Sequence, residues 1–310
     1  MKSNQTHITE FILVGFHIKA GFEILVFGLF VFFYSLTLIG NGVILGLIVL
    51  DSRLHSPMYF FLSNLATIDM LFSSTIIPNM IANILKQDKS MPFGPCLFQT
   101  YTYLAFAIAE CMNLVVMSYD RYAAICHPLH YTVIMNWRVC TALELSCWIF
   151  GFFLALVHVT LLLRVPFCGP QIINHFFCQI VSILKLACGD IRVNKIVILV
   201  GSLLCLVGPL FLVLLSYTCI LMAILKIQSR EGRKKAFSTC SSHLCVVVLF
   251  FSDLIVLYMT PKTKHTETQT KILSLFYCLF NPMLNPLIYS LRNKEVKGAL
   301  RRVLSRKRAV

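Results

Sequence analysis

Seven long apolar stretches dominate the sequence and restrict the folds that this chain can adopt. Each is long enough to cross about 30 Å of hydrocarbon as an α-helix. Charged residues supply only 13% of the 310 residues and the mean hydropathy is +0.80, whereas a soluble domain is about a quarter charged. We therefore predict an all-α membrane protein, a seven-transmembrane helix bundle formed by a single domain over residues 1–310. The predicted helices span about residues 22–49, 58–85, 97–120, 139–163, 193–225, 236–260 and 272–291.

Basic residues indicate which side of the membrane each loop faces. Sixteen of the 27 Lys and Arg residues fall on the side of the C-terminus and eleven on the other, which favours an external N-terminus. Residues 1–21 show no signal-peptide pattern, and the glycosylation sequon at Asn4 lies on the predicted external side. We expect a multi-pass plasma-membrane protein with an extracellular N-terminus and a cytoplasmic tail at 292–310. The net charge of +14 fits cytoplasmic loops that face anionic lipid and a protein partner, and no nucleic-acid motif accompanies it.

The seventh apolar stretch is interrupted by Asn281-Pro282 and Asn285-Pro286, with Tyr289 one turn further on. Each proline removes a helix hydrogen bond and favours a kink, and the asparagine amides can satisfy the freed carbonyls. A kinked, polar-lined helix suits a switch between two arrangements, although a tolerated membrane proline is the simpler alternative. After Arg292, apolar residues with helical spacing predict a short amphipathic C-terminal helix on the inner leaflet. These residues are Val296, Ala299, Leu300, Val303 and Leu304.

Nine of the thirteen cysteines lie in the predicted helices or at their inner ends, where a free thiol usually packs as a small apolar group. The other four are Cys96, Cys168, Cys178 and Cys188. An even number on the external side favours two disulfides, and three pairings are open. A zinc site that uses His175 and Cys178 is the alternative. The connection 164–192 is long and shows no helix or strand periodicity, so we predict a functional lid.

Polar residues lie near mid-membrane in four of the predicted helices. At 1.5 Å per residue, Asn41, Asp69 and Glu110 share a depth of about 15 to 17 Å from the inner surface, and Asn285 lies about a turn lower. Two ionised carboxylates would repel strongly in a medium of low dielectric constant, so Asp69 and Glu110 would share a proton or a cation if they face each other. The alternative is that each carboxylate makes its own hydrogen bonds.

The segment MSYDRYAAICHPLHY, residues 117–131, places a charge pair where the third apolar stretch ends. Asp120 and Arg121 follow a run that is apolar back to about Leu97, and charges near hydrocarbon are costly unless they are paired or hydrated. For an Asp-Arg-Tyr triplet alone, an ordinary interfacial ion pair is the simplest explanation. Together with seven apolar stretches and a basic C-terminal side, the segment indicates the coupling end of a receptor helix.

These features resemble the rhodopsin-like G-protein-coupled receptors, and within them the olfactory receptors of the tetrapod-type class. The resemblance covers almost the whole chain. Its most specific motifs are LHSPMYFFL, residues 54–62, and KAFSTCSSHL, residues 235–244. The other matching motifs are Gly40-Asn41, Asp69, MSYDRYAAICHPLHY, Ser216-Tyr217, FCGPQIINHFFC at 167–178 and NPMLNPLIYSLRNKEV at 281–296.

The resemblance implies roles for individual residues. It implies the disulfides Cys96–Cys178 and Cys168–Cys188, and an ion or proton site at Asp69 and Glu110, with sodium as the candidate ion and no other cofactor. It also implies that activation switches open a cytoplasmic cavity for a heterotrimeric stimulatory olfactory G protein, which raises cAMP through adenylyl cyclase. The implied switch residues are Asp120, Arg121, Tyr122, Tyr217, Asn285, Pro286 and Tyr289.

For the ligand, the resemblance implies a pocket in the outer halves of the third, fifth and sixth helices. An apolar wall with a few hydroxyls suits a small, volatile, mostly hydrophobic odorant, although plain helix packing is the alternative for any one residue. Asp253 stands where the family more often has a small neutral residue; at 100° per residue it lies about 200° from Phe251, so we expect it to point away from the pocket. The expected lining residues are Tyr103, Leu104, Ala107, Ile108, Cys111, Ser202, Cys205, Phe251, Leu254 and Tyr258.

Two other functions are open at this point. An olfactory-type receptor could serve a metabolite outside the nose, because the motifs do not encode a tissue. A transporter or channel would need a continuous polar path, and the chain lacks the paired repeats common in transporters. No hydrolase triad, P-loop or metal-ligand cluster is evident in the sequence, so we do not expect an enzyme.

Overall fold

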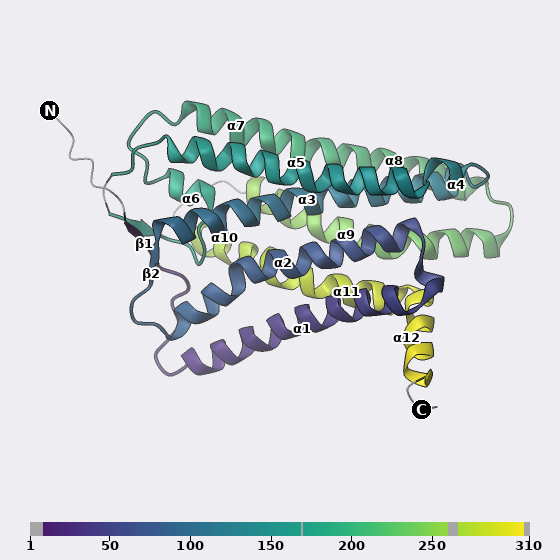
Figure 1. The fold of residues 1–310 in the computed structure, drawn as a ribbon, viewed down its shortest axis with the longest axis horizontal. Coiled ribbons are helices and arrows are strands. Elements are labelled where there is room, and N and C mark those ends of the chain that lie inside the picture. The colour runs from purple at the N-terminus through teal and green to yellow at the C-terminus, as the bar shows by residue number, and fades with distance from the viewer. Residues whose placement is uncertain (1–8, 169, 260–265, 307–310) are drawn as a thin grey trace.

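The computed structural model describes residues 9–168, 170–259 and 266–306, and helices account for most of them (Figure 1). The α-helices are α1 Glu23–Leu50, α2 Pro57–Leu85, α3 Phe93–Cys126, α4 Tyr131–Ile134, α5 Trp137–Leu163, α6 Ile180–Leu184, α7 Arg192–Ser202, α8 Gly208–Lys226, α9 Arg230–Met259, α10 Thr266–Leu275, α11 Asn281–Arg292 and α12 Lys294–Arg306. The shorter elements are the 3-10 turn η1 Ser52–Leu54, the π-helical turns η2 Leu203–Val207 and η3 Phe276–Phe280, and the strands β1 Glu10–Leu13, β2 Ser90–Pro92 and β3 Ile172–Ile173.

The long helices run side by side as one bundle (Figure 1). Six spans among the described residues are long and apolar enough to cross a membrane: α1, α2, α3, α5, the continuous run Arg192–Lys226, and Thr268–Ser290. α9 supplies the seventh, with a bend of 41° between its parts Arg230–Ser238 and Cys240–Val256. The predicted seven-helix architecture is confirmed. The bundle has a strand end, where β1 to β3 lie, and an opposite end that carries α4 and α12, which we call the basic end (Figure 1).

Three helical spans extend by several residues beyond the ranges predicted from hydropathy, and one of them is the seventh, in which α10 begins at Thr266 where residue 272 was predicted. α3 covers Phe93–Cys126 where 97–120 was predicted. Towards the basic end, the helix continues through the buried charged residues Asp120 and Arg121. α9 begins at Arg230 where residue 236 was predicted, since basic and small polar residues add turns before the apolar run. An apolar window measures the thickness of hydrocarbon, whereas a helix ends only where its backbone hydrogen bonds end.

Two prolines follow π-helical turns. η2 immediately precedes Gly208-Pro209, and η3 immediately precedes Asn281-Pro282. A proline has no N–H to donate and its ring crowds the carbonyl four residues earlier, so a wider turn relieves both effects. The disruption predicted at Asn281-Pro282 is therefore a widened turn, and Pro286 lies inside the helix that follows.

A three-stranded sheet of order β2-β1-β3 covers the strand end. β1 pairs antiparallel with β2 and parallel with β3, with Ile12 opposite both Ser90 and Ile172. The connection 164–192 contains β3 and α6, although its sequence shows no helix or strand periodicity. Strands this short are stabilised by partners far away in the sequence, so they leave no periodic pattern of their own.

Two disulfides hold this connection, hereafter the lid. Cys96 at the start of α3 is bonded to Cys178, and Cys168 is bonded to Cys188 within the lid. These are the pairings that the resemblance implied. The zinc alternative with His175 and Cys178 is wrong, because Cys178 is taken up by a disulfide; among the described residues no group of three or more His, Cys, Asp or Glu could hold a metal ion.

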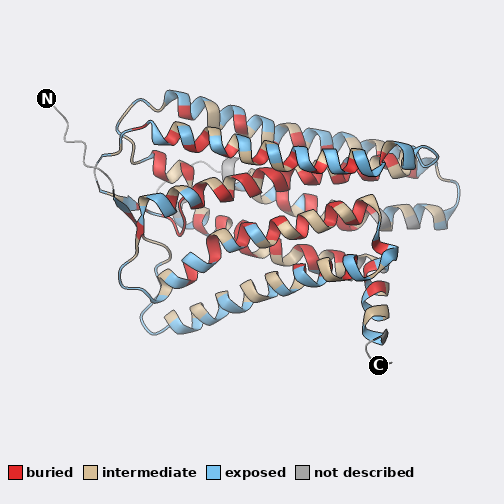
Figure 2. Ribbon diagram, viewed as in Figure 1, coloured by how far each residue is buried: buried red, intermediate tan, exposed pale blue. Residues whose placement is uncertain are grey.

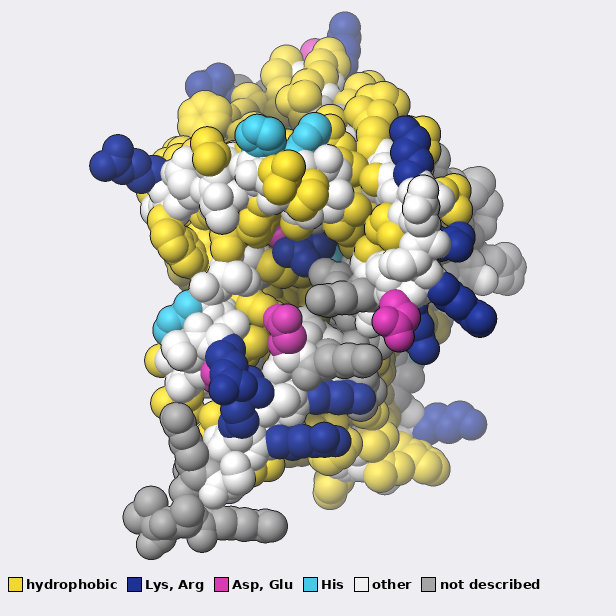
Figure 3. All heavy atoms as spheres, turned by 90° about the vertical axis from the view of Figure 1, so that its right-hand side faces the viewer, with side chains coloured by type: hydrophobic (Ala, Val, Ile, Leu, Met, Phe, Trp, Pro, Cys, Tyr) yellow, Lys and Arg dark blue, Asp and Glu magenta, His cyan; other side chains and the backbone are white. Residues whose placement is uncertain are grey.

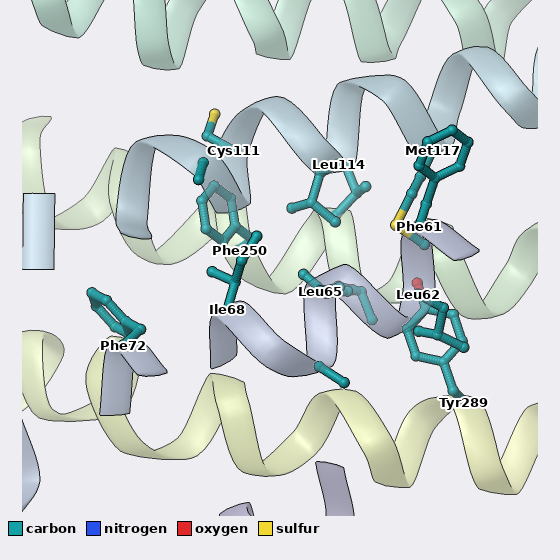
Figure 4. Packing of buried hydrophobic residues seen from close by; sticks show 14 of the residues in the cluster. Phe61, Leu62, Leu65, Ile68, Phe72, Cys111, Leu114, Met117, Phe250 and Tyr289 are labelled. Atoms are coloured by element: carbon teal, nitrogen blue, oxygen red, sulfur yellow. The ribbon is translucent and has the colours of Figure 1, made fainter. Parts of the chain in front are cut away.

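The core lies along α3, which is buried on most of its faces, whereas α1 is largely exposed (Figure 2). Large side chains of α2, α3, α9 and α11 interlock there, including Phe61, Leu114, Phe250 and Tyr289, all 2% exposed or less (Figure 4). Because lipid tails are as apolar as these side chains, the close fit of the helices stabilises the bundle more than removal from water does.

α12 lies across the basic end and is bonded to the bundle (Figure 1). Arg302 Nε donates to Asp51 Oδ2 over 2.9 Å, and the Tyr59 hydroxyl donates to Glu295 Oε2 over 2.6 Å. The hydrogen bond from Arg302 lowers the pKa of the Asp51 carboxyl, so the pair is charged at neutral pH. Of the predicted apolar face, Val296 and Ala299 are buried, while Leu300 and Leu304 stay exposed. Lys and Arg side chains spread over this end, with fewer acidic ones (Figure 3).

Candidate functional site

An apolar cavity of about 120 Å³ lies inside the half of the bundle nearer the strand end. Its wall includes one face of α3, the last turn of α7, the π turn η2 and one residue of α9. Cys111 Sγ on α3 donates to the Cys205 carbonyl over 2.6 Å and so joins two of these elements. Eight of the ten residues expected to line a ligand pocket lie on this one wall: Tyr103, Leu104, Ala107, Ile108, Cys111, Ser202, Cys205 and Leu254.

The structure does not place the remaining α9 residues on the cavity wall. Phe251 is 2% exposed and packs in the main core. The side chain of Tyr258 lies outside the described residues. Asp253 is half-buried, does not line the cavity and interacts with Asn281 of α11, so it points away from the cavity, in the direction that the helical angle predicts.

Several polar groups of the cavity wall were missed by the sequence analysis. Ser274 on α10 is 2% exposed, and its hydroxyl has no hydrogen-bond partner among the described residues. His158 on α5 is 7% exposed and faces Gly201, where an added Cβ would lie 3.1 Å from the His158 Nε2. Both residues line the cavity. Each is a lone polar residue in an apolar run, and no local pattern distinguishes it from a residue that packs against a neighbouring helix.

The lid forms the roof of this cavity. Phe177, Gln179, Ile180 and Val181 line it from the strand end. The roof is hydrogen-bonded to α3, because Gln99 Oε1 accepts the Cys178 N–H over 2.9 Å and the Tyr103 hydroxyl accepts the Ile180 N–H over 3.3 Å. The cavity is therefore closed by a segment that is attached to the bundle by a disulfide and by hydrogen bonds.

Deeper in the bundle, the two carboxylates singled out by the sequence are both buried. Asp69 is 0% exposed and Glu110 is 1% exposed, and they are close enough to interact electrostatically. Asn285 Nδ2 donates to Asp69 Oδ2 over 2.9 Å, while Asp69 Oδ1 has no partner among the described residues. Asn41 does not join this group, since its amide donates to the carbonyls of Thr37 and Pro282 and ties α1 to α11.

At the basic end, Asp120 and Arg121 form a buried ion pair. Arg121 Nε donates to Asp120 Oδ2 over 2.9 Å. The Arg121 side chain is 10% exposed and the Asp120 side chain is 0% exposed. The Tyr131 hydroxyl on α4 donates to the other oxygen, Asp120 Oδ1, over 2.6 Å. Burial and the nearby Asp120 charge raise the pKa of the Tyr131 phenol, so it remains a donor at neutral pH. Tyr131 lies within the segment 117–131, but no role was predicted for it from the sequence.

The other expected switch residues separate into two groups. Tyr217 on α8 has its hydroxyl 2.7 Å from His243 Nδ1 on α9, and Tyr289 on α11 is 1% exposed with no hydrogen-bond partner for its hydroxyl among the described residues. Both tyrosines interact electrostatically with Arg121. Tyr122 differs, because its hydroxyl lies 3.2 Å from His127 Nε2 at the end of α3. The predicted glycosylation residue Asn4 lies outside the described residues.

Comparisons with known proteins give full-length matches. The sequence profile of the olfactory receptor family matches residues 30–307. Olfactory receptor 2A12 of Homo sapiens is 66% identical over 310 residues, and Olfactory receptor 2A7 of Mus musculus is 56% identical over 310 residues, each match covering 100% of both chains. Among solved structures, squid rhodopsin superimposes with a TM-score of 0.68 at 17% identity, over 91% of this chain and 86% of that chain. At this identity, the likeness to squid rhodopsin concerns the fold.

Proposed function

Because the chain belongs to the olfactory receptor family, we propose that it detects a small, volatile, mostly hydrophobic odorant in the inner cavity. The odorant-bound receptor then activates a stimulatory olfactory G protein, which raises cAMP. It is a receptor and not an enzyme. We place it in the plasma membrane, with an extracellular N-terminus and the basic end facing the cytoplasm and anionic lipid. The observation that carries the ligand assignment is the position of eight expected residues on the wall of one apolar cavity.

The wall chemistry supports an apolar ligand with one hydrogen-bonding group. Burial of about 200 Å² of apolar surface would contribute about 5 kcal/mol, whereas one neutral hydrogen bond adds about 1 kcal/mol. Burial therefore supplies most of the affinity, and the polar groups select the orientation. The Ser274 hydroxyl is the strongest candidate partner, since it is buried in the wall and has no partner among the described residues.

The basic end supports a switch that starts from a locked arrangement. Arg121 is held by Asp120, which is also held by Tyr131. In our proposal, an odorant binds the active arrangement more tightly, Arg121 leaves Asp120, and a cavity opens for the G protein. Tyr217, Tyr289 and the Asn285-Pro286 segment of α11 are the proposed moving parts, because the two tyrosines interact electrostatically with Arg121 and the segment follows a widened turn.

We further propose that Asp69 and Glu110 share a proton or a sodium ion. Two buried carboxylates that interact electrostatically avoid repulsion only if one is neutral or a cation lies between them. Carboxylate oxygens suit a hard cation, and Asp69 Oδ1 is a buried acceptor without a hydrogen-bond partner among the described residues.

An odorant screen with a cAMP reporter tests the proposed function. In cells that display the receptor at equal surface levels, Ala107→Phe should fill the cavity and abolish the response to every active odorant. Ala142→Phe, on an exposed face of α5, is the matched control and should respond normally. Arg121→Ala should reach the surface and fail to signal. An unchanged response of Ala107→Phe would refute the ligand site, and full signalling by Arg121→Ala would refute the switch.

A further inference from the structure

A second cavity, larger than the first, lies at the strand end outside the helix core. Its volume is about 390 Å³, and it is enclosed by the chain segment after β1, the start of α1 and the last turns of α2. Leu13, Ile18, Met80 and Ile84 give it an apolar wall, and Phe176 of the lid closes one side. No residue lines both this outer cavity and the inner one.

An aromatic cluster of the lid separates the two cavities. Phe176 lines the outer cavity, and its neighbour Phe177 lines the inner one. The His175 ring lies against both, with ring centroids 4.7 Å from each. The outer cavity is therefore a separate compartment, and its occupant need not be the molecule that binds inside the bundle.

The chain segment after β1 forms the roof of the outer cavity, and hydrogen bonds and an aromatic contact hold it in place. The chain turns at Gly15, with φ of 64°, and at Gly21, with φ of 87°, two left-handed conformations that favour glycine. Lys271 Nζ donates to the Gly15 carbonyl over 2.7 Å and to Asn174 Oδ1 over 2.6 Å, which joins the roof, the lid and α10. Phe16 stacks on Phe176 with ring centroids 5.2 Å apart.

The lining carries three charged side chains, Lys86, Lys89 and Glu23, and the neutral amides of Asn83 and Gln87, so its net charge is positive. Lys86 and Lys89 line the cavity, and within the described part of the chain neither ammonium group forms an ion pair or a side-chain hydrogen bond. Glu23 also lines it, but one of its oxygens, Oε2, accepts the Gly21 N–H over 2.8 Å. The cavity thus combines an apolar wall with two unpaired cations at one end of α2.

From this combination we infer that the outer cavity binds an amphiphile, an apolar chain that ends in an anionic group. The chain would lie against the Leu13, Ile18, Met80 and Ile84 wall, and the anionic group would pair with Lys86 and Lys89. A free fatty acid and an anionic phospholipid of the surrounding membrane share this chemistry. The inference does not depend on which odorant, if any, binds the inner cavity.

A photolabelling experiment on the purified full-length receptor tests this site. The receptor is placed in nanodiscs of phosphatidylcholine and exposed to decanoic acid that carries a diazirine on its chain. We expect labelled peptides from residues 13–18 and 80–89. Excess decanoic acid should displace the label, whereas decanol should not, because it lacks the charge. If phosphatidylglycerol in the nanodisc displaces the label and decanoic acid does not, the occupant is the membrane lipid.

Matched variants separate the site from general lipid contact. Lys86→Gln together with Lys89→Gln should reduce labelling about five- to tenfold, since the double variant removes both positive charges that pair with the anionic group and exposed ion pairs are weak. Met80→Trp should block labelling by filling the cavity, and Lys195→Gln, a lysine of α7 that does not line it, should leave labelling unchanged. Undiminished labelling in the double variant, or label spread over the lipid-facing helices, would overturn the proposal. Equal thermal unfolding temperatures show that the variants are folded.

Discussion

At the residue scale, the hydroxyl of Tyr131 gives the buried Asp120 carboxylate a second partner beside Arg121. A hydrogen bond to a charged group contributes about 1.5–3 kcal/mol. The bond is made only while α4 stays against the end of α3, so it stabilises the arrangement in which Arg121 is held.

We therefore expect Tyr131→Phe to raise ligand-free signalling. Loss of this hydrogen bond destabilises the locked arrangement by about 1.5–3 kcal/mol, which shifts the equilibrium by a factor of about 10–150 toward the active one. The measurement is cAMP without odorant at matched surface expression. Tyr119→Phe removes the hydroxyl of an exposed tyrosine on α3, the helix that carries Asp120, and is the control. Equal basal cAMP in the two variants would contradict the role of Tyr131.

We predict that the stability of the lid depends on pH through the His175 side chain. Burial, and then the charges of Lys271 and Lys185, lower its pKa to about 3 in the folded protein, whereas an unfolded histidine has a pKa of about 6.5. Between these values the unfolded chain binds a proton that the folded chain does not. The stability of the lid is therefore complete above pH 6.5 and falls as the pH drops toward 3, by up to about 1.4 kcal/mol per pH unit.

The test compares wild type with His175→Leu in detergent. We expect the apparent Tm of the wild type to fall more steeply than that of the variant between pH 7 and pH 5. Carboxylates titrate in both proteins, so only the difference reports His175. Parallel curves for the two proteins would show that His175 is not buried in its neutral form.

At the element scale, the contact between α3 and α5 depends on a glycine. A Cβ at Gly151 would lie 2.6 Å from the Ala105 carbonyl oxygen and 3.2 Å from the Ala109 nitrogen, and both atoms belong to the α3 backbone. Small residues that let two backbones approach are typical of helix contacts in membranes. The position of α5 against α3, and with it the position of His158 in the cavity wall, follows from this contact.

Gly151→Ala should therefore separate the two helices and reduce stability by about 1–3 kcal/mol. Gly42→Ala is the matched control, because a Cβ at Gly42 of α1 meets nothing within 4 Å. Alanine is also the better helix former, so the control should be neutral or slightly more stable. The readouts are the apparent Tm of purified receptor and surface expression. If both variants behave alike, the close approach of α3 and α5 does not contribute to stability.

At the scale of the whole molecule, the inner cavity and the basic end lie in opposite halves of one bundle and are connected by α3. If both sites favour the same arrangement, binding is reciprocal, and each partner raises the affinity of the other by the same factor. A typical coupling free energy of about 1–3 kcal/mol corresponds to a factor of about 5–150.

We expect nucleotide-free G protein to lower the Kd of an active odorant by such a factor, and the odorant to lower the Kd of the G protein equally. Binding to purified receptor in nanodiscs measures both. Arg121→Ala should bind the odorant with the lower affinity and show no change when the G protein is added. An odorant affinity that G protein leaves unchanged in the wild type would refute the two-state coupling.

Features that are encoded by a local sequence pattern could be predicted before the structure was known. The mean hydropathy over about 20 residues identifies a membrane span directly, which is why seven helices could be predicted. Helical periodicity groups Tyr103, Leu104, Ala107 and Ile108 on one face of α3, and the family motifs added the neighbouring helices. The cysteine count left three pairings open, and only the resemblance implied the pairs that the structure has.

Features that depend on the relative offset and rotation of elements far apart in the sequence became known only from the three-dimensional structure. Asn285 was expected about a turn below Asp69, yet its amide donates to the Asp69 carboxylate, because counting residues along each helix does not fix the offset between two helices. Tyr131 meets Asp120 because a short helix turns back under α3. Other features also arise where several elements meet: the sheet, the outer cavity, and the position of Ser274 and His158 in the inner cavity wall. No single stretch of sequence encodes the distances between these elements.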